Sequence, residues 1–119
     1  MVKFQMAALS EGLRKPLEVL GKRFCFCNDA EGRKLIGEKS ESEHLSVCAT
    51  ATEVKITYAG LNHFLRGVAM AVRKEREGIL SFSMDEEVNF SFNGLMVDCS
   101  RNGVINLPYA KEVLDRLAM

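Results

Sequence analysis

The chain has no tryptophan and no surplus of either charge. Its 119 residues include 16 Lys and Arg and 16 Asp and Glu, so its formal net charge is zero. Zero net charge gives no electrostatic reason to expect nucleic acid or an anionic membrane as a partner. No apolar run approaches the ~20 residues of a membrane-spanning helix, and no signal-peptide pattern opens the chain. We therefore expect a cytoplasmic protein that binds neither nucleic acid nor a membrane; a neutral ligand or a protein partner fits better.

Cysteine is too scarce and too unevenly spaced for a metal site. The four cysteines are Cys25, Cys27, Cys48 and Cys99. Cys25 and Cys27 lack the two-residue gap of common zinc knuckles, and no second pair follows. Four cysteines are also too few for a small disulfide-stapled protein. We expect reduced, mostly buried thiols, because free cysteine is among the most buried residue types, and we expect no metal and no cofactor.

Paired acid–base groups are also missing. General acid–base hydrolysis needs two titratable groups that converge on one bond. The one carboxylate cluster in a strand context is Asp85–Glu87, which reads as a solvated turn between two strands. His44 and His63 are isolated, without metal-ligand spacing. We expect no complete enzyme active site in this chain by itself.

The first part of the chain predicts a strand followed by a helix. Apolar side chains alternate with polar ones over residues 1–8, which indicates a strand. Leucines then recur at helical spacing over residues 9–24. Pro16 lies inside this pattern, so the helix either begins near Lys15 or is kinked by the proline. Gly21 is expected to end it.

The middle of the chain predicts a loop, a hairpin and a second helix. Residues 28–42 read as a loop because of their glycines, and the adjoining charged run Glu38–Glu43 is a solvated loop or, alternatively, a recognition loop. The alternating segments 45–50 and 53–58 predict an antiparallel hairpin. The strongest helical pattern follows, predicting a helix over Gly60–Lys74. Its solvent-facing side carries Asn62, Arg66 and Arg73.

The pattern of apolar residues changes near residues 88–94. Segments 80–85 and 88–93 alternate as strands, but Leu95–Val97 is an unbroken apolar run, which suits a strand buried on both faces. Pro108 then suits the first turn of a helix that continues to the end of the chain.

These patterns predict an α+β fold of two parts. Residues 1–88 have the order β-α-β-β-α-β, typical of a small sheet with helices on one face. Residues 89–119 form one strand–loop–helix unit, the opening of a βα repeat. We therefore expect an amino-terminal α+β domain followed by the first βα unit of an incomplete (β/α)8 barrel.

The candidate binding residues follow the buried strand. In a βα barrel, substrate groups are bound just past the carboxyl ends of the strands, where Asp98 and Arg101 lie. The planar guanidinium of Arg101 suits hydroxyl or carboxylate oxygens, and Asp98 could orient it. The alternative is that Arg101 makes a surface salt bridge.

The segment Gly94–Val104, followed by 108–118, resembles the first barrel strand and helix of the family 20 glycoside hydrolases, the exo-acting β-N-acetylhexosaminidases. Many members carry His after the Arg, where this chain has Asn102. The predicted hairpin and following helix also resemble the small α+β domain that precedes the family's barrel. The resemblance implies that Arg101 binds hydroxyls of a terminal N-acetylhexosamine.

The resemblance also implies what the chain lacks. A barrel needs about 250 residues, and the family's catalytic Asp–Glu pair has no counterpart here. We therefore expect a fragment of a hexosaminidase, truncated or natural, that acts on an N-acetylhexosamine-containing glycan only with the full barrel. The unpartnered segment 88–119 would fold back or form a homodimer, and we favour the dimer. The alternative is a non-catalytic protein-interaction or regulatory α+β module. A carbohydrate-binding module is disfavoured by the lack of Trp.

Overall fold

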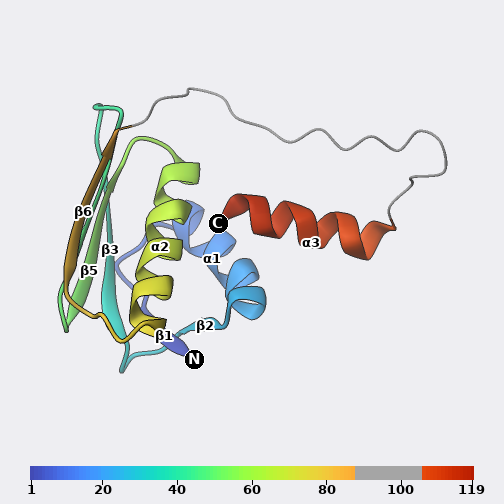
Figure 1. The fold of residues 1–119 in the computed structure, drawn as a ribbon, viewed down its shortest axis with the longest axis horizontal. Helices are drawn as coiled ribbons and strands as arrows, with labels where there is room; N and C mark the ends of the chain where they lie inside the picture. Colours follow the sequence, from blue (N-terminus) through green and yellow to red (C-terminus); the bar gives the residue numbers. More distant parts are fainter. Residues whose placement is uncertain (88–105) are drawn as a thin grey trace.

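A six-stranded mixed sheet forms the framework of the part of the chain that the computed structural model describes, residues 1–87 and 106–119. The strands lie in the order β2-β1-β3-β5-β4-β6 (Figure 1). The pairs β1/β2, β1/β3 and β3/β5 are parallel, whereas β4 is antiparallel to both β5 and β6. The strands span Val2–Gln5 (β1), Phe26–Asn28 (β2), Arg33–Lys39 (β3), His44–Ala49 (β4), Glu53–Tyr58 (β5) and Phe82–Glu87 (β6).

Two helices, α1 (Glu11–Phe24) and α2 (Leu61–Arg76), cover one face of this sheet (Figure 1). Gly37 of β3 shows that both helices lie on the same side. A Cβ atom at Gly37 would meet Leu13 of α1 at 2.9 Å and Phe64 of α2 at 3.1 Å. The apolar stripes of the two helices and the inward side chains of the strands form one buried core. The α+β class, with helices on one face, is therefore confirmed.

Helix α2 approaches the sheet closely at Gly67. A Cβ atom there would lie 2.8 Å from Cγ2 of Ile56 on β5. Phe64, Val68 and Ala71 of the same helix are fully buried. The helix predicted over Gly60–Lys74 is thus confirmed with nearly the same bounds, and its apolar face fills the centre of the core.

The predicted order β-α-β-β-α-β is wrong, because two strands were missed. The observed order is β-α-β-β-β-β-α-β. β3 lies within the segment 28–42, for which a loop was predicted, and it occupies a central position between β1 and β5. Leu35 is completely buried there, but charged residues alternate with it on the uncovered face, and Gly37 reads as a breaker. Because one face of β3 is exposed to solvent, its amino-acid composition resembles that of a loop, and the sequence pattern did not reveal the strand.

Helix α1 begins at Glu11 and includes Pro16, so the alternative start near Lys15 is wrong. Gly21 does not end it. The helix continues to Phe24 and is terminated by Cys25, which adopts a left-handed conformation (φ 57°) and donates its N–H to the carbonyl of Gly21. A left-handed residue after the last turn is a common way to end a helix.

Two further strand predictions can be compared with the structure. The 45–50 and 53–58 hairpin is confirmed as β4 and β5, and the strand at 80–85 as β6, two residues further along. The predicted strands at 88–93 and Leu95–Val97 lie outside the described residues, as does the proposed boundary at residue 88.

The predicted last helix is confirmed as α3 (Leu107–Ala118). The Asn106 side chain accepts a hydrogen bond from the Tyr109 N–H at 2.9 Å, and Pro108 lies in the first turn. The helix projects from the body and approaches it with its C-terminal end (Figure 1), where Arg23 of α1 pairs with Asp115 at 2.6 Å. In the described ranges, no helix is both long and apolar enough to cross a membrane.

Candidate functional site

The two residues predicted to bind substrate, Asp98 and Arg101, lie outside the described residues. The structure therefore leaves their predicted roles open. It does place the helix that follows them, α3, which contacts α1 and α2 with its C-terminal part only.

The carboxylate cluster Asp85–Glu87 belongs to edge strand β6 and is not the turn that we predicted. Successive strand residues point to opposite faces, so the cluster is divided. Glu86 faces the helices and accepts two hydrogen bonds of 2.7 Å from Arg66 of α2. Asp85 faces the other way, where Ser46 donates to it at 3.2 Å. These two carboxylates cannot converge on one bond as an acid–base pair.

The Arg66–Glu86 pair changes the proton affinity of both groups. The hydrogen bonds from Arg66 lower the pKa of Glu86 below its usual value, and those to Glu86 raise the pKa of Arg66. Both side chains are largely exposed. The pair therefore fixes β6 to α2 weakly, as exposed ion pairs do.

Each histidine lies near one of these carboxylates, His44 near Asp85 and His63 near Glu86. His44 is half-exposed, with its Nδ1 atom 3.7 Å from Asp85. His63 lies in the first turn of α2, where its buried Nδ1 has no hydrogen-bond partner among residues 1–87 and 106–119. Within residues 1–87 and 106–119, no group of three or more His, Cys, Asp or Glu side chains could hold a metal ion.

The cysteines are less buried than we predicted. Cys25 and Cys48 are exposed, and Cys27 is half-buried; all three are free thiols. Cys25 is exposed because it terminates α1, and Cys48 because its position on β4 points to the uncovered face of the sheet. Cys99 lies outside the described residues.

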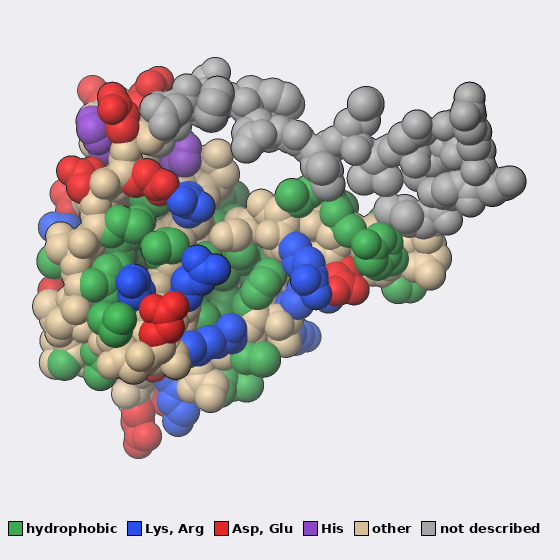
Figure 2. Space-filling model, viewed as in Figure 1, with side chains coloured by type: hydrophobic (Ala, Val, Ile, Leu, Met, Phe, Trp, Pro, Cys, Tyr) green, Lys and Arg blue, Asp and Glu red, His purple; other side chains and the backbone are tan. Residues whose placement is uncertain are grey.

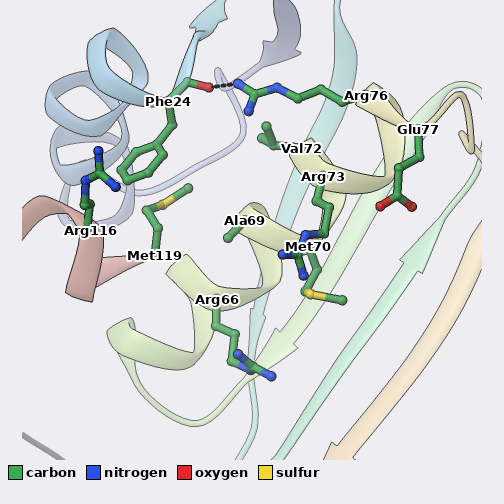
Figure 3. Close-up of a pocket in the computed structure, with 10 residues that line it drawn as sticks. All are labelled: Phe24, Arg66, Ala69, Met70, Val72, Arg73, Arg76, Glu77, Arg116 and Met119. Carbon is green, nitrogen blue, oxygen red and sulfur yellow. Dashed lines mark hydrogen bonds between the residues drawn. The ribbon is translucent and has the colours of Figure 1, made fainter.

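A groove on the helical side of the molecule brings together residues that are far apart in sequence (Figure 3). Its volume is about 560 Å³, and it lies between α2, the end of α1 and the last turn of α3. Four of its side chains are arginines, so we name it the arginine groove. It is lined by Phe24, Arg66, Ala69, Met70, Val72, Arg73, Arg76, Glu77, Arg116 and Met119.

The helical repeat of α2 supplies one wall of the arginine groove. Arg66 and Arg73 are seven residues apart and share the solvent-facing side of α2, whereas Arg76 lies at the edge of the buried stripe and reaches Phe24 of α1. The opposite wall includes the Phe24 ring, Arg116 and Met119 (Figure 3). Figure 2 shows Lys and Arg side chains on this side of the molecule, with hydrophobic side chains between them.

The four arginines differ in how their charges are compensated. Arg66 pairs with Glu86, and Arg116 pairs with Glu112 one turn earlier at 2.8 Å. Arg76 donates to the backbone carbonyl of Phe24, a neutral acceptor. Arg73 makes no ion pair or side-chain hydrogen bond with any other described residue.

Sequence reasoning did not identify this groove. Arg66 and Arg73 were predicted on the solvent-facing side of α2, and they are exposed there. Arg76 and Arg116 were missed. The spacing of Arg76 from Arg73 was a usable signal, but nothing local to α3 indicates that Arg116 meets α2.

No protein-family model matches the chain, and a search of curated proteins likewise finds no match.

Proposed function

We propose that the chain is the amino-terminal part of a hexosaminidase of the family 20 type, comprising its small α+β domain and the first strand and helix of its barrel. In this proposal Arg101 binds hydroxyls of a terminal N-acetylhexosamine, and Asp98 orients it. The 119 residues alone do not catalyse hydrolysis, because the catalytic Asp–Glu pair has no counterpart in them. The glycan is bound only when the whole barrel is present.

The observation that carries the proposal is helix α3, which follows the motif segment Gly94–Val104. Its three leucines, Leu107, Leu114 and Leu117, are 67%, 65% and 56% exposed. Leaving such groups in water forfeits about 1.5–3 kcal/mol each compared with full burial. An outer helix of a barrel buries such a face against the barrel strands, so this exposure supports a missing structural neighbour.

The architecture before α3 adds support. Residues 1–87 have a buried core of their own, with helices on one face of a sheet. The small domain of the family likewise contains a hairpin followed by a helix. This likeness is one of layout and does not by itself choose a function.

The coding sequence beyond Met119 tests this proposal. An open frame that encodes further βα units with an Asp–Glu pair supports it. A stop codon followed by unrelated sequence contradicts it and favours a free-standing protein.

The second candidate is a non-catalytic protein-interaction or regulatory module. It is favoured by the sheet face opposite α1 and α2, which no described helix covers (Figure 1). The strand register places Lys34, Glu38 and Lys55 on this face, where Lys55 and Glu38 pair at 2.9 Å. Specific binding of a protein partner by residues 1–88 alone, lost when charges on this face are reversed, would favour this candidate.

A further inference from the structure

We propose that the arginine groove binds a small organic anion, one that joins a phosphate or carboxylate group to an apolar body. This site is separate from the sugar-binding role proposed for Arg101. It uses residues of α1, α2 and α3 that the proposed hydrolase function leaves without a role.

The charges of the groove favour an anion. Four guanidinium groups line it, against the side-chain carboxylate of Glu77 and, in the 119-residue chain, the terminal carboxylate of Met119. Two of the four are compensated by carboxylates nearby, Glu86 for Arg66 and Glu112 for Arg116. Glu77 lies 3.9 Å from Lys74, which offsets its charge. Among the described residues, no side-chain carboxylate pairs with Arg73 or Arg76, so their positive charges are available to a ligand.

Each of these two arginines can contact an anionic group separately. Arg73 and Arg76 are three residues apart on α2, but their guanidinium groups point apart: Arg76 reaches the Phe24 carbonyl, and Arg73 turns toward Met70 (Figure 3). The hydrogen bond from Arg76 to the Phe24 carbonyl restrains that guanidinium while leaving other N–H groups free. Guanidinium forks bind phosphate and carboxylate oxygens in pairs. Restraint before binding also lowers the entropy lost on binding.

The remaining walls specify the apolar body of the ligand. The Phe24 ring, Met70, Val72 and Met119 supply a hydrophobic lining beside the arginines (Figure 3). Apolar walls exclude water, and the attraction between ligand and guanidinium is stronger where water is excluded. The volume of about 560 Å³ is in the range of small-molecule sites, roughly 300–1,000 Å³. A bare inorganic ion would leave most of this lining in water.

Titration calorimetry of the full 119-residue chain with phenyl phosphate and with benzoate tests the proposal. These probes carry a phosphate and a carboxylate on the same kind of ring, so comparing them identifies the preferred anionic group. Inorganic phosphate serves as the probe without an apolar body. We expect saturable binding at one site for at least one of the ring-bearing probes, weaker binding of inorganic phosphate, and weakening with added salt.

Arg73→Gln is the decisive variant, and Arg14→Gln is its control. Arg73 is exposed, so its substitution removes one guanidinium group without disturbing the hydrophobic core. Arg14 of α1 lies outside the groove and pairs only with the exposed Glu18. We expect affinity to fall about tenfold or more in Arg73→Gln and to stay unchanged in Arg14→Gln, with both variants folded by circular dichroism. The absence of saturable binding, or equal weakening in both variants, would overturn the proposal.

Discussion

At the scale of single residues, Arg33 is the charged group that the fold depends on most. It is 8% exposed, although it begins a strand that is otherwise rich in solvated charges. Its guanidinium pairs with Glu75 of α2 at 2.6 Å and donates to the carbonyls of Thr50 and Leu80. One side chain thus joins β3 to the end of α2, the β4–β5 turn and the segment that leads into β6.

Replacement of Arg33 by Met should therefore be strongly destabilising. It leaves the carboxylate of Glu75 and two carbonyls without their donor, and breaking a largely buried ion pair costs about 3–5 kcal/mol. Urea denaturation measures the loss in free energy of unfolding. Arg14→Met, which breaks the exposed Arg14–Glu18 pair, should cost less than about 1 kcal/mol. Similar small losses in the two variants would show that the Arg33 pair is not structural.

The Arg66–Glu86 pair predicts a small dependence of stability on pH. The pKa of Glu86 is lowered in the folded protein from its usual 4.5. The ionised Glu86 therefore stabilises the folded protein above pH 4.5. This stabilisation is lost as the pH falls through the lower pKa of the folded state. Because the pair is exposed, Glu86→Gln should cost less than about 1 kcal/mol at pH 7 and almost nothing at pH 2. Urea denaturation at the two pH values measures this difference, and a cost that grows on acidification would contradict the assignment.

At the scale of elements, the sequence predicts best those that bury one regular face. Helix α2 was predicted from its apolar stripe and the β4–β5 hairpin from strict alternation, because both patterns are set by the core. Strand β3 was not predicted, because its outward face is exposed to solvent. On its inward face Gly37 stands where Leu13 and Phe64 pack against the strand, so no side chain marks that position. The arginine groove was not predicted; Arg66 and Arg73 were placed only on the solvent-facing side of α2. The meeting of α2 with α1 and α3 depends on packing across the whole chain, such as the Arg23–Asp115 pair.

The close contact between α2 and β5 predicts that replacing glycine by alanine changes the stability of the protein differently at two helical positions. Gly67→Ala should destabilise the protein by about 1–3 kcal/mol, because its Cβ would lie 2.8 Å from Ile56 and overpacking outweighs the gain in helix propensity. At Gly12 of α1 a Cβ meets nothing within 4 Å. Gly12→Ala should therefore be neutral or stabilising by up to about 1 kcal/mol. Thermal denaturation compares the two, and an equal effect at both positions would contradict the close approach of α2.

At the scale of the whole molecule, the exposed leucines of α3 predict self-association of the 119-residue chain. With no barrel to cover Leu107, Leu114 and Leu117, a second copy can bury them, and a symmetric dimer is the commonest closed arrangement. Light scattering over a concentration series should show a monomer–dimer equilibrium that Leu114→Glu shifts to monomer. Glu18→Gln, an exposed change on α1, should leave it unaltered. A monomer at every concentration would contradict the dimer.

The central claim is that this chain supplies the first substrate-binding arginine of a hexosaminidase. The most direct measurement is kcat/KM for a chromogenic N-acetylglucosaminide, in the protein that carries the barrel, with Arg101 replaced by Ala. A lost hydrogen bond to a charged donor is worth about 1.5–3 kcal/mol, so we expect kcat/KM to fall about ten- to hundredfold while the melting temperature is unchanged. Unchanged kinetics in Arg101→Ala would contradict the claim.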